Sequence, residues 1–327
     1  MVIYILQEIN KIVFSHNIFK MNYLNLVRYK NLILIAFMQL LFCFGFLKLQ
    51  NVDLALANFQ YYLLVLSTVL IAAGGYVINN IFDQETDLEN DKEVVVGKTI
   101  SEKSAYNLYF VLNLIGVGIA FYLSQIIQRP NFVVFFILIV TILYFYATTL
   151  KQLPLIGNIA VAFILSFSII IIGIYQLLPA TDEMNKVQMR TLFSILFDFA
   201  IITFIINLIR EIVKDLEDFK GDNSQGMRTL SIILGIEKTT KLIAFLLVVP
   251  IVLILLYINN YLMENKLYYA TVYILITIIA PLTYVLVKIV TAKIKSEFHH
   301  LSTVLKIVLF FGIVTIVVIS QNIIHNG

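Results

Sequence analysis

The sequence predicts an all-α, polytopic membrane protein whose nine transmembrane helices form two pseudo-repeated four-helix units plus a final helix around a central cavity. The first observation is composition, because the 327 residues are 60% hydrophobic and only 13% charged, whereas soluble domains are about 25% charged. The second is a series of apolar stretches of about 20 residues, the length that crosses a bilayer. The third is an acidic motif that occurs twice. Together they exclude an ordinary soluble domain.

The nine predicted spans follow each other without a linker or a low-complexity tract between them. They cover about 32–49, 56–81, 104–126, 132–149, 155–178, 191–212, 239–259, 267–290 and 303–323. Residues 21–327 are therefore predicted to form one membrane domain. Residues 1–20 are predicted to be an N-terminal extension, either an interfacial helix or an over-long start, because they lack the small-residue cleavage site of a signal peptide.

Positive charge predicts the orientation of these spans. With nine spans and the N-terminus inside, most of the 23 Lys and Arg residues fall on or near the inner face. The exceptions, near the outer face, are Lys48, Arg129, Lys186, Arg190 and Lys266. This asymmetry follows the positive-inside rule. It predicts a multi-pass protein of the plasma (inner) membrane with both acidic motifs on the cytoplasmic side.

The two acidic clusters belong to an internal repeat. More than half of the 20 acidic residues lie in 83–102 and 211–222. One offset of 135 residues separates Asp83 from Asp218, Asp87 from Asp222, and Glu102 from Glu237. Each unit consists of a span, an acidic end, a loop, a Glu-Lys pair and another span. This arrangement predicts that the acidic loops face each other across one cavity.

Helical spacing places the polar groups of each cluster on one face. Residues three or four apart lie on the same side of a helix, so Asn79, Asp83 and Asp87 form one stripe. The second stripe holds Asp215, Asp218 and Asp222. Carboxylates brought together at a membrane boundary need cations to hold them, and Mg²⁺ prefers such oxygen ligands together with water and phosphate. A solvated acidic loop is the bland alternative, and it fits Glu85, Glu89, Glu93 and Glu217.

At these residues the chain resembles the UbiA-type intramembrane prenyltransferases. Asn79-x-x-x-Asp83-x-x-x-Asp87 resembles their first aspartate-rich motif, and Asp215-Leu-Glu-Asp218-Phe-Lys-Gly-Asp222 resembles their second. The resemblance implies Mg²⁺-dependent transfer of a polyprenyl group from its diphosphate, with Mg²⁺ held by Asp83, Asp87, Asp218 and Asp222. The implied catalytic residues are Asn79, Asp83, Asp87, Tyr146, Lys151, Asp215, Asp218 and Asp222.

The acceptor is narrowed by a further resemblance. Asn207 to Asp215, followed by Gly226-Met227-Arg228-Thr229-Leu230, resembles the branch that makes digeranylgeranylglyceryl phosphate. The segment after Asp87 departs from the family because it lacks a proline and the first basic residue, and Lys92 and Lys98 are expected to replace that charge. The predicted substrate-binding residues are Arg28, Lys92, Lys98, Asn158, Arg210, Lys214 and Arg228.

The predicted partners are a prenyl diphosphate donor, a lipophilic acceptor and the lipid bilayer, with no nucleic acid. A prenylglyceryl phosphate is the favoured acceptor, and an aromatic quinone precursor is the alternative. A terpene cyclase on the same scaffold would use the same metal site without an acceptor. A secondary transporter would instead place polar groups at the midplane. Lys306, just inside the last span, either snorkels to the interface or reaches a substrate phosphate, and Asp198 has no assigned role.

Overall fold

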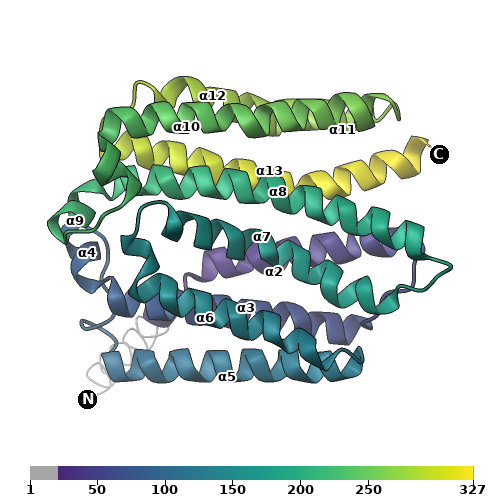
Figure 1. The fold of residues 1–327 in the computed structure, drawn as a ribbon, viewed down its shortest axis with the longest axis horizontal. Coiled ribbons are helices and arrows are strands. Elements are labelled where there is room, and N and C mark those ends of the chain that lie inside the picture. Colours follow the sequence, from purple (N-terminus) through teal and green to yellow (C-terminus); the bar gives the residue numbers. More distant parts are fainter. Residues whose placement is uncertain (1–20, 327) are drawn as a thin grey trace, which may run out of the picture.

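The protein is a bundle of long helices, seen here in a computed structural model that describes residues 21–326 (Figure 1). Nine of the described helical segments are long and apolar enough to cross a membrane. Eight of them contain α2 (Tyr29–Phe44), α3 (Asn58–Phe82), α5 (Glu102–Ile126), α6 (Val133–Thr148), α7 (Ile156–Gln176), α8 (Lys186–Glu217), α10 (Leu230–Tyr257) and α13 (Lys295–Asn326). The remaining one joins α11 (Tyr268–Ile274) to α12 (Ala280–Ile289). The predicted all-α, nine-span membrane fold is confirmed, and the prediction for residues 1–20 lies outside the described residues.

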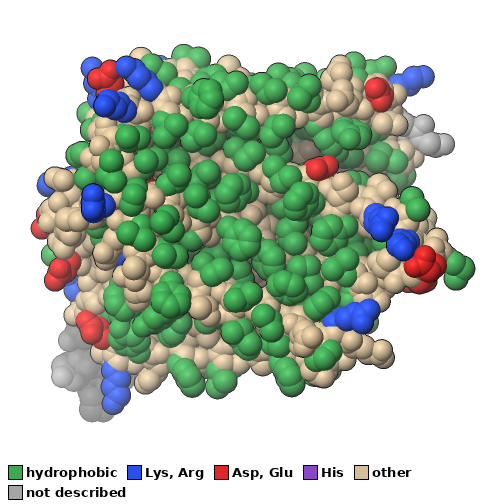
Figure 2. Space-filling model, in the orientation of Figure 1, with side chains coloured by type: hydrophobic (Ala, Val, Ile, Leu, Met, Phe, Trp, Pro, Cys, Tyr) green, Lys and Arg blue, Asp and Glu red, His purple; other side chains and the backbone are tan. Residues whose placement is uncertain are grey.

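The surface matches a bilayer. In Figure 2 hydrophobic side chains cover the middle of the visible face, while Lys, Arg, Asp and Glu gather mainly at its two ends. Large apolar side chains such as Phe59, Phe110 and Phe245 are about two-thirds exposed. Exposure on this scale has a large cost in water but none in lipid, where the helices satisfy their own backbone hydrogen bonds. The chain is therefore an integral, multi-pass membrane protein.

Two hydrophobic clusters hold the bundle together. The first is centred on α2, α3, α7 and the N-terminal half of α8 and includes Phe42, Tyr61 and Tyr175. The second joins the C-terminal half of α8 to α10, α11, α12 and α13 and includes Ile212 and Phe298. Because α8 belongs to both clusters, it connects the two halves of the molecule.

The acidic ends of the two units fold alike. Helix α3 ends at Phe82 and α4 (Gln84–Glu89) begins one residue later. Helix α8 ends at Glu217 and α9 (Phe219–Ser224) also begins one residue later. The residues between them have nearly the same backbone, with φ −96° and ψ 3° at Asp83 and φ −92° and ψ 5° at Asp218. A ψ near 0° bends the chain, so each predicted stripe turns at its middle aspartate instead of running straight.

The bent ends bring the two acidic loops together. Helices α4 and α9 lie side by side at one end of the bundle (Figure 1). Asn90, which is buried after α4, accepts a hydrogen bond through Oδ1 from the backbone N–H of Gly221 at 2.9 Å. A β-carbon at Gly221 would lie 2.4 Å from Asn90 Nδ2, so this contact needs glycine. The close approach places both acidic pairs at one end of the bundle.

Some predicted span boundaries were wrong. Helix α8 runs from Lys186 to Glu217, well beyond the predicted 191–212. Helix α10 begins at Leu230 and not near 239, and it contains a bend at Gly235, where φ is 75°. Polar residues concealed both extensions, because a helix can continue past the apolar stretch that identifies a span. The added turns of α8 carry Lys214 and Asp215 toward the acidic loops.

Candidate active site

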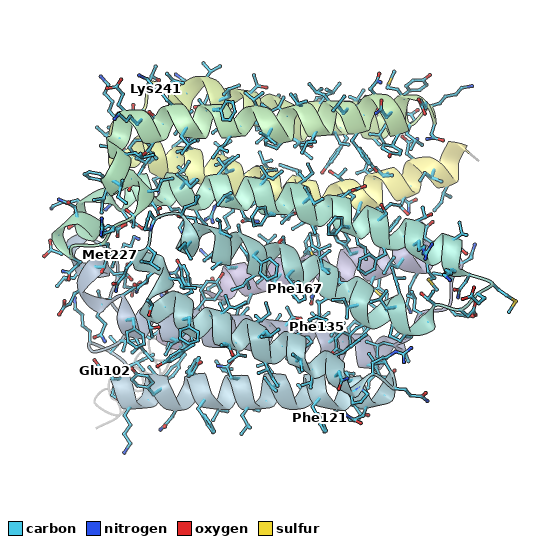
Figure 3. All side chains as sticks on the ribbon, viewed as in Figure 1. Glu102, Phe121, Phe135, Phe167, Met227 and Lys241 are labelled. Carbon is cyan, nitrogen blue, oxygen red and sulfur yellow. The ribbon has the colours of Figure 1, made fainter. Side chains whose placement is uncertain are left out.

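A cavity of about 270 Å³ lies between the two units and reaches from the acidic loops into the bundle. Its polar end is lined by Asn79, Asp83, Asp87 and Lys92 from the first unit and by Glu211, Lys214, Asp215, Asp218 and Asp222 from the second. Its apolar part includes Phe135 on α6 and Phe167 on α7, whose ring centroids are 5.8 Å apart (Figure 3). The sequence-predicted aspartates of both motifs therefore line one cavity.

Lysines connect the carboxylates of the two units. Lys92 donates a hydrogen bond to Asp218 Oδ2 at 2.6 Å, and its Nζ lies 3.7 Å from Asp87 Oδ1. Lys151, which follows α6, is paired with Asp83, and Asn79 donates to the same carboxylate. Because Lys92 belongs to the first unit and Asp218 to the second, this ion pair crosses between the repeats.

The carboxylates are hard to ionise without a nearby cation. Burial raises the pKa of Asp222 to about 7, and the negative charge of Asp218 adds to this rise. Burial also raises the pKa of Asp87, with a further contribution from Asp83, although Lys92 opposes it. Burial alone would lower the pKa of Lys92, but attraction to Asp218 raises it overall. The site thus favours additional positive charge.

The donor set suits Mg²⁺. Among residues 21–326, no three His, Cys, Asp or Glu side chains are grouped so that they could hold a metal ion by themselves. Mg²⁺ is usually bound by one or two carboxylates while water and substrate phosphates complete its shell, so pairs of aspartates facing a cavity are sufficient. Asp218 Oδ1 is buried without a hydrogen-bond partner in the described structure, as expected of an oxygen available to a cation.

A charged group lies inside the membrane-spanning part of α8. Glu211 accepts hydrogen bonds from Arg210 at 3.1 Å and from Lys214 at 2.8 Å, and its side chain is only 8% exposed. Asp215 accepts a hydrogen bond from Asn158 Nδ2 at 2.9 Å. Charged residues inside a span are costly and usually functional, and this group lines the cavity next to the acidic loops.

The predicted substrate-binding residues divide into two sets. Arg28, Lys92, Arg210 and Lys214 line the cavity, as do the predicted catalytic residues Tyr146 and Lys151. Asn158 acts through its hydrogen bond to Asp215. Lys98 and Arg228 are exposed and do not line the cavity. Their positive charge near the motifs suggested a role, but charge in a loop does not determine the direction of its side chain.

Arg28 has an unusual backbone and a clear orientation. It lies directly before α2 with φ 50°, in the left-handed region, which a non-glycine residue adopts at some cost. Its guanidinium group lies 5.4 Å from the ring centroid of Tyr76, a cation–π distance. The conformation directs the cation toward the cavity, as the sequence analysis expected.

Sequence reasoning missed several cavity residues. Asn31, Tyr76 and Ser168 line the cavity, and Asn90 joins the loops. They are common polar residues within or beside spans, and a period of 135 residues places no matching side chain opposite them. The one available signal was the position of Tyr76, directly across the repeat from Glu211.

The fold and the site define a membrane protein with two repeated aspartate motifs at one end of a helical bundle. The model of the UbiA prenyltransferase family matches residues 40–307, so the chain belongs to this family. Among its relatives, digeranylgeranylglyceryl phosphate synthase of Sulfurisphaera tokodaii is 37% identical over 56% of this chain and 60% of that protein. The same-named enzyme of Saccharolobus solfataricus is 32% identical over 71% of this chain and 75% of that protein. The matched part thus covers less than two-thirds of the first relative.

Solved structures show the same fold. One, described as a study of digeranylgeranylglyceryl phosphate synthase in membranes, matches with a TM-score of 0.63 at 22% identity, over 92% of this chain and 98% of that one. Another is a UbiA homologue from Archaeoglobus fulgidus bound to GPP and Mg²⁺, with a TM-score of 0.52 at 15% identity, over 90% of this chain and 99% of that one. At these identities the likeness establishes the fold alone.

Proposed function

We propose that the protein transfers a polyprenyl group from its diphosphate to a prenylglyceryl phosphate, in a Mg²⁺-dependent reaction at the cytoplasmic face of the membrane. The observation that carries this proposal is the single cavity that joins two aspartate pairs to an apolar, aromatic interior. The digeranylgeranylglyceryl phosphate synthases among the relatives support the acceptor class. The GPP and Mg²⁺ bound to a neighbouring structure support the donor and the metal.

The acidic loops suit the diphosphate end of the donor. Asp83, Asp87, Asp218 and Asp222 would hold Mg²⁺, which would neutralise the charge that grows on the leaving diphosphate. Lys151 and Lys92, now paired with these carboxylates, are placed to bind the diphosphate oxygens directly. Asn79 orients Asp83 through its hydrogen bond. Asn158 holds Asp215 in the same way.

The apolar part of the cavity suits the prenyl chain and the reacting carbon. Breaking the allylic C–O bond leaves its electron pair on the diphosphate and positive charge on carbon. The acceptor hydroxyl oxygen then forms the new C–O bond and loses its proton to the diphosphate or to water. Phe135, Phe136 and Tyr146 line this region, where aromatic faces stabilise positive charge and apolar walls keep water from capturing the carbon.

A competition experiment tests the proposed acceptor. The purified protein would receive labelled geranylgeranyl diphosphate and Mg²⁺ together with equal amounts of geranylgeranylglyceryl phosphate and dihydroxynaphthoate. We expect label mainly in the diether phosphate, and none of this product when Mg²⁺ is chelated. Predominant labelling of the aromatic ring would contradict the acceptor assignment, whereas a cyclised hydrocarbon formed without either acceptor would indicate a terpene cyclase.

A further inference from the structure

A second cavity adjoins the first, deeper in the membrane-spanning part of the bundle. It has a volume of about 100 Å³ and lies among α2, α7, α8 and α13. Arg210, Tyr76, Asn31 and Ser168 line both cavities, so the two spaces share one boundary. Lys306 on α13 lines only the second of these two cavities. Nothing in the proposed handling of the donor diphosphate uses this lysine.

Lys306 is a cation in an unfavourable position. It is the twelfth residue of α13, about 16 Å along the helix at 1.5 Å per residue, and it is only partly exposed. Its Nζ donates to the neutral Asn31 Oδ1 at 2.7 Å. Arg210, Lys30, Lys214 and Arg28 all repel its charge. A membrane-embedded cation normally has an anionic partner or marks a substrate path.

Arg210 also has unused binding capacity. One guanidinium nitrogen is paired with Glu211, but Glu211 is shared with Lys214, so one carboxylate serves two cations. The Nε atom of Arg210 is buried and has no hydrogen-bond acceptor in the described structure. A buried N–H without an acceptor is costly. Arg210 and Lys306 together therefore provide a site for an anion that is not supplied by any of these side chains.

We propose that Lys306 and Arg210 bind the phosphate of the acceptor in this second cavity, an inference that rests on the proposed function. The remaining lining includes Met38, Leu309 and Ile313, apolar side chains suited to the first carbons of the acceptor's prenyl chain. The boundary shared with the first cavity leaves the glycerol hydroxyl facing the donor. The site is thus distinct from the aspartate–Mg²⁺ site and selects a phosphorylated lipid alcohol.

The charge arrangement explains why an acceptor phosphate fits better here than the donor diphosphate. The diphosphate is drawn to Mg²⁺ between the acidic loops, where carboxylates hold the metal. The second cavity contains no Asp or Glu among its lining residues and two cations. A phosphomonoester carries enough charge to pair with both, whereas an uncharged or aromatic acceptor would leave Lys306 without an anion.

The test is direct binding of labelled geranylgeranylglyceryl phosphate to the purified protein in detergent, with Mg²⁺ and without donor. We expect Lys306→Met to weaken binding about 10-fold or more, the usual effect of losing a charged hydrogen-bond partner, and Lys306→Arg to restore most of it. The matched control is Lys288→Met at the end of α12, an exposed lysine that lines neither cavity. Mg²⁺-dependent binding of a non-hydrolysable donor analogue should be unchanged in all variants, which also verifies folding.

Competitors separate the sources of the phosphate. We expect the dephosphorylated geranylgeranylglycerol to compete poorly with the labelled ligand for wild-type protein and equally well for both wild type and Lys306→Met. Dioleoyl phosphatidate should compete weakly. Equal competition by phosphatidate would overturn the acceptor assignment in favour of a general anionic-lipid site, and unchanged affinity in Lys306→Met would overturn the phosphate site itself.

The same experiment distinguishes this inference from the proposed function. If wild-type protein binds the labelled acceptor through Lys306 but does not prenylate it when donor is added, the proposed function fails and the binding site stands. If wild-type protein prenylates the acceptor and Lys306→Met does so with an unchanged KM, the function stands and the inference fails. A higher KM for the donor in Lys306→Met would also contradict the inference, because it would place the lysine at the diphosphate.

Discussion

The two repeat units share a backbone but differ in charge. Across the offset of 135 residues, Asp83 and Asp87 correspond to Asp218 and Asp222, and the helices that carry them end at corresponding residues. Even the turns that follow agree, since the N–H of Lys92 donates to the Asp87 carbonyl as that of Met227 donates to the Asp222 carbonyl. The aspartates therefore belong to what both units do.

The differences lie one to two turns inside the membrane. Gly75, Tyr76, Asn79 and Asn80 of the first unit are neutral, whereas their counterparts Arg210, Glu211, Lys214 and Asp215 are all charged. Since charge inside a span is costly, this contrast shows that the second unit has taken on an additional binding role. Conversely, the first loop supplies Lys92 where the second has Met227. The units thus contribute equally to the metal site and unequally to the substrates.

The largest expected effect is a symmetric one. Asp83→Ala and Asp218→Ala should each lower kcat by at least about 100-fold, the scale of losing one preorganised charge in an active site, because each removes a metal ligand and no core packing. Turnover with saturating donor and acceptor and excess Mg²⁺ measures this. Glu89→Ala, on the exposed face of α4, should retain wild-type activity. A large loss in only one of the two aspartate variants would break the proposed equivalence of the units.

The intramembrane charges should make the units unequal in stability. Glu211→Gln leaves Arg210 and Lys214 without their carboxylate and should reduce the free energy of unfolding by about 2 kcal/mol, less than a fully buried pair would lose, because both cations are partly exposed. Thermal unfolding in detergent would show this as a lower midpoint. The repeat-related Tyr76→Phe should cost much less, since Tyr76 carries no charge. Equal shifts in the two variants would contradict the asymmetry.

The loops differ at the position after each acidic helix. Lys92→Met gives the first loop the residue that the second has at this position, and it should raise the KM for donor about 10-fold because a charge-assisted contact to the diphosphate is lost. The control Lys98→Met changes an exposed lysine outside the cavity and should leave the donor KM unchanged. A similar rise in both variants would indicate a general effect of loop charge.

The smallest expected effect concerns pH. Burial and Asp218 raise the pKa of Asp222 to about 7, so this carboxylate becomes protonated as pH falls through 7. Protons then compete with Mg²⁺, and the apparent Mg²⁺ dissociation constant should rise about threefold between pH 7.5 and pH 6.5. Mn²⁺ binding followed by electron paramagnetic resonance measures it. A constant that stays flat or falls over this range would contradict an Asp222 that titrates there.

Sequence predicted the fold and the principal residues of the candidate site because both have strong local signals. Span length gives the helix count, and a conserved offset within the chain pairs Asp83 with Asp218. The bends at these residues were not predicted, since helical periodicity assumes a straight axis. The second cavity was also beyond reach, because it depends on how α13 packs against α2 and α8, and no pattern within one helix links Lys306 to Arg210.

The most direct test of the central claim is whether the two units act at one site. Binding of a non-hydrolysable prenyl diphosphate in the presence of Mg²⁺ would be measured for wild type, Asp83→Ala, Asp218→Ala and the double variant. Residues that act as a unit are strongly non-additive, so we predict that the double variant binds little worse than either single variant. If the two losses in binding free energy simply add, the aspartates of the two units do not share one metal–diphosphate site and the account is wrong.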